Sequence, residues 1–235
     1  QGKTNPHAFL SSMEFRAAVR SDRTLFTWGN GDQGQLGQGR SVEYHYYGPH
    51  FVAAPVEIPG HLFGGELVGS VACGCQFTLV VTHCGGLFSF GTGGYGQLGH
   101  GDNAVNATRL ALTRVEAFVD TRITMAAAGN LHSLVMADDG CMWSFGINGS
   151  GQLGVFGDDA HESAIPLPVE SLGSPSDVVY VAAADSYSMA ITADGKLYAW
   201  GNNDYGQLGL GDMRAVYTPV LVCLEEGPGD ADGSG

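Results

Sequence analysis

The chain has 235 residues, 44% of them hydrophobic, and its 10 Lys and Arg against 24 Asp and Glu give a formal net charge of −14. This acidic balance, with no basic run, argues against direct binding to a nucleic-acid backbone. No stretch approaches the roughly 20 apolar residues of a membrane span, so we expect no transmembrane segment. Five Cys, an odd number, indicate thiols in a reducing compartment rather than a disulfide framework. We therefore expect an intracellular protein, with the cytoplasm or nucleus favoured and an organelle still open.

One motif is written four times along the chain. It joins an aromatic residue and a glycine to a Gly-Gln-Leu-Gly turn at a constant offset, and the copies lie at residues 28–39, 90–101, 145–157 and 200–211. A fixed period near fifty residues indicates a modular array. We expect residues 1–224 to form the repeat domain. Residues 225–235, which are rich in Gly and acidic residues, should form a flexible tail.

A predicted β-hairpin precedes each aromatic-Gly pair. Short apolar segments flank a turn, and Asp139-Gly140 and Asp194-Gly195 supply residues that tolerate the positive φ of tight hairpin turns. No window shows a helical stripe, so the chain is predicted to be all-β with about four strands per repeat. Four-stranded sheets arranged around an axis bury both faces against their neighbours, which favours a β-propeller.

The repeated residues have a structural interpretation. The glycines fall where a turn needs φ > 0 or where backbone presses against the next blade, and the aromatic and Leu side chains should fill the core. The predicted structural residues are Trp28, Gly29, Gly34, Leu36 and Gly37; Phe90, Gly91, Gly96, Leu98 and Gly99; Phe145, Gly146, Gly151, Leu153 and Gly154; and Trp200, Gly201, Gly206, Leu208 and Gly209.

These residues resemble the repeats of the regulator of chromosome condensation family, whose unit carries an aromatic-Gly, a GQLG and a downstream Pro-Val. That Pro-Val stands at Pro55-Val56, Pro168-Val169 and Pro219-Val220, whereas the second repeat has TRLALTRV at residues 108–115. The resemblance implies a propeller, usually of seven blades. Four repeats leave three arrangements open: part of a longer ring, an open arc completed by a partner, or a compact four-bladed ring.

A cluster of potential metal ligands has a simpler explanation. Cys73 and Cys75 precede a predicted strand, while His83 and Cys84 fall in the turn that follows it. The intervening segment, residues 76–82, would be about 23 Å long at ~3.3 Å per residue, too long for one ion to bridge. We expect no metal site.

Apparent catalytic patterns also follow from the repeat. Residues 29–34 and 91–96 match Gly-x-Gly-x-x-Gly, but a turn rather than a helix follows each, so no helix N-terminus is available for a pyrophosphate. His132 stands where other repeats have Phe77 and Tyr187, which favours a flat ring rather than a base. We expect no catalytic residue and no cofactor.

Two segments that break the repeat are candidate interaction loops, because loops on a rigid scaffold carry specificity. The first repeat has a surplus within residues 41–52, and residues 155–163 form a second variable loop. Aromatic rings with polar tips are favoured at interface centres. The candidates are Tyr44, His45, Tyr46, Tyr47, His50 and Phe51 in the first loop and Asp158, Asp159, His161 and Glu162 in the second. Alternatively, the first loop covers its own blade and the second faces water.

The family's propellers serve several roles, including nucleotide exchange, ubiquitin ligation, photoreception and scaffolding, so the fold does not fix the function. We predict a non-catalytic protein–protein interaction or scaffold module, a structural or adaptor part of a larger assembly, whose protein partners are basic or belong to a complex. The alternative is a guanine-nucleotide exchange factor for a Ran-type GTPase. Exchange needs a wedge beside the nucleotide phosphates, and the Tyr and His content of residues 41–52 does not resemble an acidic wedge.

Overall fold

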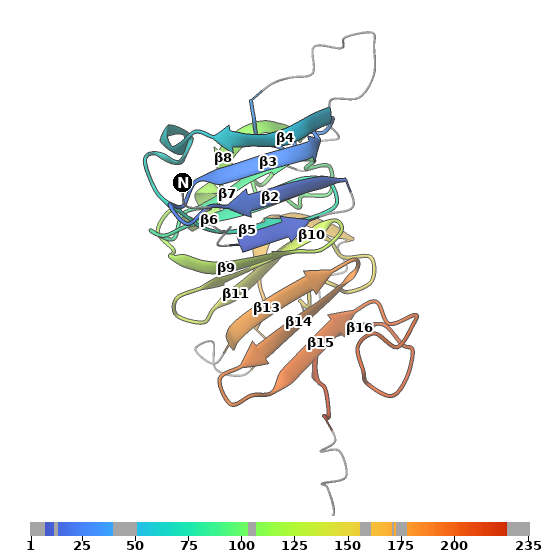
Figure 1. Cartoon of the computed structure of the whole chain (residues 1–235). Coiled ribbons are helices and arrows are strands. Elements are labelled where there is room, and N and C mark those ends of the chain that lie inside the picture. Colours follow the sequence, from blue (N-terminus) through green and yellow to red (C-terminus); the bar gives the residue numbers. More distant parts are fainter. Residues whose placement is uncertain are drawn as a thin grey trace, which may run out of the picture.

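A computed structural model describes residues 8–11, 14–39, 51–102, 107–155, 161–170, 172 and 178–224, which form four antiparallel sheets of four strands each (Figure 1). Blade 1 contains β1 (Ala8–Ser11), β2 (Phe15–Val19), β3 (Leu25–Asn30) and β4 (Phe51–Ile58). Blade 2 contains β5 (Val68–Cys73), β6 (Phe77–Thr82), β7 (Leu87–Gly91) and β8 (Arg109–Arg114). Blade 3 contains β9 (Ile123–Ala128), β10 (His132–Ala137), β11 (Met142–Ile147) and β12 (Glu162–Pro168). Blade 4 contains β13 (Val178–Ala184), β14 (Tyr187–Thr192), β15 (Leu197–Gly201) and β16 (Val216–Leu221).

Each blade is a meander in which every strand pairs with its neighbour in the sequence. The predicted tight turns are present: Gly140 and Gly195 have φ of 80° and 82°. In blade 1 the same turn holds Arg23, with φ 72°, the one non-glycine residue of positive φ in the described part of the chain. Short 3₁₀ helices, η1 (Gly60–Phe63) and η2 (Glu116–Phe118), follow β4 and β8. The prediction of an all-β chain with four-stranded repeats is confirmed.

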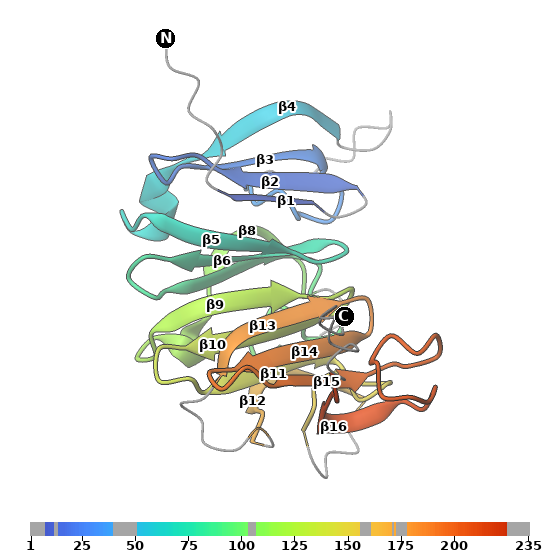
Figure 2. The same ribbon diagram turned by 60° about the horizontal axis from the view of Figure 1, so that its bottom comes forward.

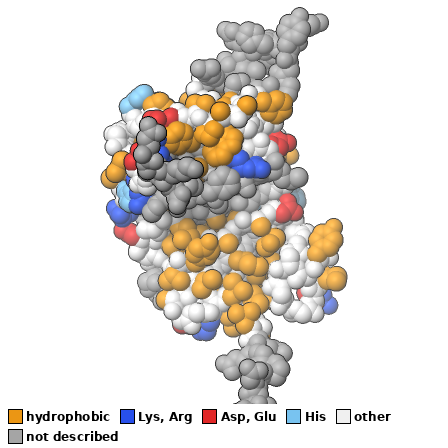
Figure 3. Space-filling view, viewed as in Figure 1, with side chains coloured by type: hydrophobic (Ala, Val, Ile, Leu, Met, Phe, Trp, Pro, Cys, Tyr) orange, Lys and Arg blue, Asp and Glu red, His pale blue; other side chains and the backbone are white. Residues whose placement is uncertain are grey.

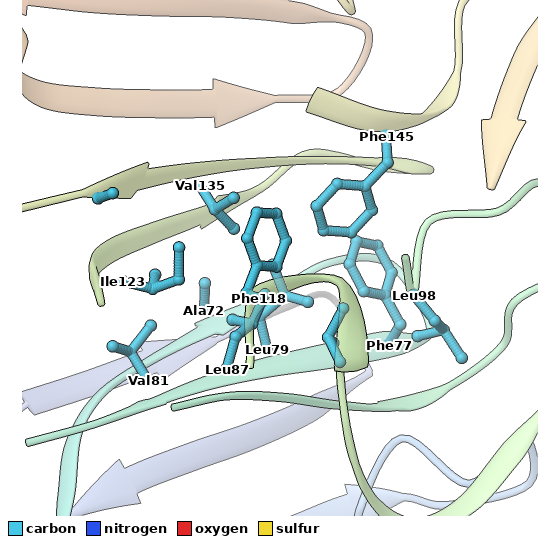
Figure 4. Packing of buried hydrophobic residues seen from close by; sticks show 12 residues of the cluster. Ala72, Phe77, Leu79, Val81, Leu87, Leu98, Phe118, Ile123, Val135 and Phe145 are labelled. Carbon is cyan, nitrogen blue, oxygen red and sulfur yellow. The ribbon is translucent and has the colours of Figure 1, made fainter. Parts of the chain in front are cut away.

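The hydrophobic core lies between blades. We call the face of a blade that points toward the next blade along the chain its forward face, and the opposite face its rear face. Because side chains alternate along a strand, Phe77, Leu79 and Val81 of β6 share the forward face of blade 2. They pack against Val135 and Phe145 on the rear face of blade 3 (Figure 4).

The burial of the second strand reflects a blade's position in the stack. Every residue of β6 and of β10 is buried, because blades 2 and 3 have a neighbour on both faces. In contrast, β2 alternates between buried and half-buried residues, and β14 alternates as well. Both faces of the second strand are therefore buried in the two middle blades, whereas only one face is buried in the two outer blades.

The Gly-Gln-Leu-Gly turn connects consecutive blades. A Cβ built on Gly37 would lie 2.8 Å from the Phe90 ring, and one on Gly154 would lie 2.5 Å from Nε1 of Trp200. Both glycines also have a left-handed backbone, with φ of 66° and 70°. Only a residue without a side chain allows the ring of the next blade to lie against this turn.

The blades form an open stack. Blade 1 and blade 4 lie at opposite ends of it, with blades 2 and 3 between them (Figures 1 and 2). Of the three arrangements compatible with four repeats, the compact four-bladed ring does not match the described residues. The forward face of blade 4 and the rear face of blade 1 are consequently the two ends of the stack.

Candidate interaction surface

Polar groups of the repeat are used inside the blade junctions. The hydroxyls of Thr78, Ser133 and Ser188 each donate a hydrogen bond to the main-chain oxygen of the Gln in the preceding turn, at 2.9, 2.7 and 2.8 Å. Nε1 of Trp200 donates to the same oxygen of Gln152 at 3.0 Å. These buried hydrogen bonds fix the register between blades.

His132 lies in the junction between blades 3 and 4. Its Nε2 is 2.9 Å from the hydroxyl of Ser188, and because that hydroxyl already donates to Gln152, the imidazole acts as the donor. Its Nδ1 has no hydrogen-bond partner among the described residues. Complete burial lowers the pKa of His132 to about 4, so the ring is neutral at physiological pH. This environment suits a packed ring rather than a general base.

The cysteine-rich segment contains isolated thiols rather than a ligand cluster. All five cysteines are free. Burial raises the pKa of Cys73 to about 12, which keeps it a thiol, whereas Cys84 is exposed in the turn after β6. Within the described part of the chain, no three His, Cys, Asp or Glu side chains gather in a way that would hold a metal ion.

The first candidate loop leads into an exposed edge strand. Tyr44, His45, Tyr46, Tyr47 and His50 lie outside the described residues, and Phe51, the first residue of β4, is 65% exposed. All of β4 except Val52 and Ile58 is exposed, whereas most residues of the outer strands β8 and β12 are half-buried. Hydrophobic side chains are visible over β4 in the space-filling view (Figure 3).

A groove of about 500 Å³ follows β4 and continues to η1. It is lined by Gln38, Phe51, Val52, Val56, Glu57, Ile58, Pro59 and Leu62. Val56 and Leu62 are 39% and 42% exposed, so the groove offers apolar surface to solvent, with one carboxylate at its side. Val56 and Leu62 are not among the interaction residues predicted from the sequence, although Pro55 within the strand is a signal of an edge position.

The second candidate loop is attached to a different blade. Asp158 and Asp159 lie outside the described residues, while His161 is exposed and Glu162 is half-buried at the start of β12. The main-chain oxygen of His161 accepts a hydrogen bond from the amide of Asn148 at 2.6 Å. Of the described residues in the two loops, His161 and Glu162 lie on blade 3 and Phe51 lies on blade 1, so these three residues do not form one site.

A family model decides the classification. The regulator of chromosome condensation (RCC1) repeat model matches residues 22–81, 85–136, 139–191 and 194–229. The chain belongs to the RCC1 repeat family. The resemblance inferred from the motif is thus confirmed.

The names of curated relatives indicate diverse roles. The chain is 33% identical to the Ultraviolet-B receptor UVR8 of Arabidopsis thaliana, over 87% of this chain and 43% of that protein. It is 32% identical to the mitochondrial RCC1 domain-containing protein RUG3 of the same plant, over 92% of this chain and 46% of RUG3. It is 30% identical to the human E3 ubiquitin-protein ligase HERC2, over 87% of this chain but only 4% of HERC2. The chain spans less than half the length of these relatives.

Solved structures share the fold. Human WBSCR16 superposes with a TM-score of 0.80 at 24% identity, covering 95% of this chain and 54% of that one. Yeast RCC1 (Prp20), in a structure bound to Kap60, superposes with a TM-score of 0.78 at 23% identity, covering 96% of this chain and 50% of Prp20. At these identities the likeness concerns the β-propeller blades alone. No helix formed by the described residues is long and apolar enough to cross a membrane.

Proposed function

We propose that this chain is a non-catalytic protein-interaction module of a larger assembly, and that the groove beside β4 is its main partner-binding surface. This proposal rests mainly on the exposure of β4 to solvent. An edge strand that presents Phe51 and Val56 to solvent is a surface that soluble proteins normally cover or charge. Apolar patches of this kind, rimmed by polar groups, are typical of protein–protein contacts.

The chemistry of the groove suggests the kind of partner. Val56 and Leu62 supply apolar contact, Gln38 supplies hydrogen bonds, and Glu57 adds a negative charge. With a formal net charge of −14 on the whole chain, a partner segment that combines apolar anchors with Lys or Arg fits this surface best. Residues 41–52, which include the predicted aromatic loop, end at the groove and are proposed to extend it.

The comparisons are consistent with a module that works within larger proteins or complexes. HERC2 contains its matching region within a far longer chain, and Prp20 was solved bound to Kap60. We do not propose guanine-nucleotide exchange for this chain, because the likeness to yeast RCC1 supports the fold only. An intracellular location remains a prediction, and the name of RUG3 keeps an organelle among the compartments to test.

Quantitative affinity purification tests the proposal. The variant Val56→Asp with Leu62→Asp places two charges in the groove. Ile165→Asp is the matched control, because Ile165 is 63% exposed on β12 of blade 3, away from the groove. Loss of a central interface anchor costs about 2 kcal/mol or more, a roughly 30-fold loss in affinity. We expect partners recovered with the wild-type chain and the control to be depleted with the groove variant at an unchanged Tm.

An identical set of partners with all three proteins would contradict the proposed groove. A nucleotide-release assay with a Ran-type GTPase tests the functional class separately. We expect no acceleration of release by the chain, and a clear acceleration would contradict a purely non-catalytic role.

A further inference from the structure

The turn at the tip of blade 1 differs from the corresponding turns of the other blades. The strand pairing places Arg23 where blades 2, 3 and 4 have Gly85, Gly140 and Gly195. All four residues have a left-handed backbone, with φ between 72° and 93°. Glycine adopts this backbone without strain, whereas in arginine the Cβ atom crowds the following carbonyl oxygen. Blade 1 therefore holds an arginine at a position where the turn favours glycine.

This turn position faces the linker to the next blade. In blade 2, a Cβ atom built on Gly85 would lie 2.5 Å from Cγ of Arg122, in the linker to blade 3. In blade 1 the corresponding linker is formed by residues 59–67, and Figures 1 and 2 show η1 beside the turn between β2 and β3. Arg23 therefore belongs to the junction between blades 1 and 2. It is independent of the rear face of blade 1 and of the forward face of blade 4.

The junction between blades 2 and 3 has its arginine in the linker instead of the turn. Arg122 donates hydrogen bonds from Nη1 to the main-chain oxygen of Cys84 at 3.4 Å and from Nη2 to that of His83 at 3.0 Å. Its Nε lies 3.8 Å from the carboxylate of Asp138, whose amide donates to the main-chain oxygen of Arg122. In the first linker the amide of His83 donates to the main-chain oxygen of Leu67 in the same way, at 2.8 Å. Leu67 therefore takes the place of Arg122, but its side chain cannot form the hydrogen bonds that tie the linker to the turn.

The junction between blades 1 and 2 thus combines a cation that lacks a partner with an exposed apolar side chain. Among the described residues, none forms a hydrogen bond or an ion pair with the guanidinium of Arg23, whereas Arg20 in the same turn pairs with Asp22. Arg23 is half-buried, and Leu67 is 56% exposed. A Cβ atom built at residue 64 or 65 of the linker would meet no atom within 4 Å. The linker therefore leaves the surface beside this turn open.

The chemistry of Arg23 and Leu67 indicates the kind of partner. A guanidinium group pairs best with a carboxylate, to which it can donate two parallel hydrogen bonds. The exposed side chain of Leu67 adds apolar contact. The net charge of −14 weakens this attraction little, because at physiological salt charges more than about 8 Å away are largely screened. Strained backbone in a surface turn is typical of functional residues, which favours a binding role for Arg23 over a purely structural one.

We propose that Arg23 and Leu67 form a docking site for an acidic segment of a partner protein. A carboxylate of this segment pairs with the guanidinium of Arg23, and a neighbouring apolar side chain of the segment packs on Leu67. The site uses none of the residues that line the groove beside β4. Because the groove favours a basic segment, the two surfaces select partner segments of opposite charge.

Selection from a random-peptide display library tests the proposal. The library is selected on the wild-type chain and counter-selected on the Arg23→Ala variant, so that peptides bound elsewhere, including those in the groove, are removed. We expect the remaining peptides to carry Asp or Glu next to Leu, Ile, Val or Phe. A selection that enriches no acidic peptide would overturn the proposal, and so would the enrichment of basic sequences alone.

Fluorescence anisotropy with the enriched peptides separates binding from stability. Arg23→Ala and Arg23→Gly should each weaken binding about tenfold, the effect of losing one charge-assisted hydrogen bond, and Leu67→Ser should weaken it as well. Only Arg23→Gly should also raise the urea midpoint of unfolding, because it relieves the strained backbone.

Two control variants define the site. Arg214→Ala removes one positive charge from blade 4, where the Arg214 side chain is 89% exposed, and should leave the affinity unchanged. Val56→Asp in the groove should leave it unchanged too. Wild-type affinity in both Arg23 variants would overturn the proposal and leave Arg23 as a turn residue only. A loss of affinity in Val56→Asp that matches the loss in Arg23→Ala would overturn the separation of the site from the groove.

Discussion

The buried imidazole of His132 should make the stability of the junction between blades 3 and 4 depend on pH. In the unfolded chain this side chain gains a proton as pH falls through its ordinary pKa of 6.5, whereas burial keeps the folded form neutral down to a pKa of about 4. Between these values the unfolded state binds more protons, so stability falls as pH decreases through this window. At 1.36 kcal/mol per unit, the difference amounts to about 3 kcal/mol.

Urea denaturation from pH 7.5 to pH 4 measures this effect. His132→Phe introduces the residue type that Phe15 and Phe77 provide at the same position, so we expect the variant to lose about 3 kcal/mol less than the wild-type chain over this window. The hydroxyl of Ser188 keeps its bond to Gln152 in the variant. His83→Phe is the control, because His83 is exposed in the turn after β6 and lies outside the junction between blades 3 and 4. Equal pH slopes for wild type and His132→Phe would refute the reasoning.

Two further predictions concern the turns and the thiols. Gly154→Ala should destabilise the chain by about 3 kcal/mol in urea denaturation, because the new Cβ combines left-handed backbone strain with a clash at 2.5 Å against Trp200. Gly209→Ala should cost only about 1 kcal/mol, since its nearest contact is at 3.4 Å and the strain alone remains; equal losses would contradict the tight contact between Gly154 and Trp200. A thiol reagent at pH 8 should label exposed Cys84 rapidly and half-buried Cys73, whose pKa burial raises to about 12, much more slowly, as peptide mapping would show. Equal labelling rates would be inconsistent with the raised pKa of Cys73.

The sequence predicted the blades well because the motif is made of local requirements. A glycine that must adopt positive φ and a Leu and an aromatic ring at fixed offsets repeat regardless of their neighbours, as the turns at Gly37 and Gly154 illustrate. The position of His132 was predicted to need a ring. Its hydrogen bond to Ser188 was not, because that contact crosses from one blade to another over 56 residues.

The surfaces were harder to predict, because a hydrophobic pattern shows which residues are apolar but not which face stays uncovered. Leu79 and Met189 occupy equivalent positions, yet Leu79 is fully buried and Met189 is not. The groove beside β4 could not be predicted for the same reason. Val56 belongs to a Pro-Val pair that recurs in three of the four repeats, so the sequence does not show that this Val is exposed. Its exposure follows from the positions of β4 and η1 in the folded chain.

The groove is built on the forward side of blade 1, around Val56 of β4 and Leu62 of η1. Thr27 and Val56 are paired, and the hydroxyl of Thr27 donates a hydrogen bond to the main-chain oxygen of Leu36 on the forward side of the blade. Val56 consequently points away from the rear face of blade 1, and a partner bound in the groove leaves that rear face uncovered.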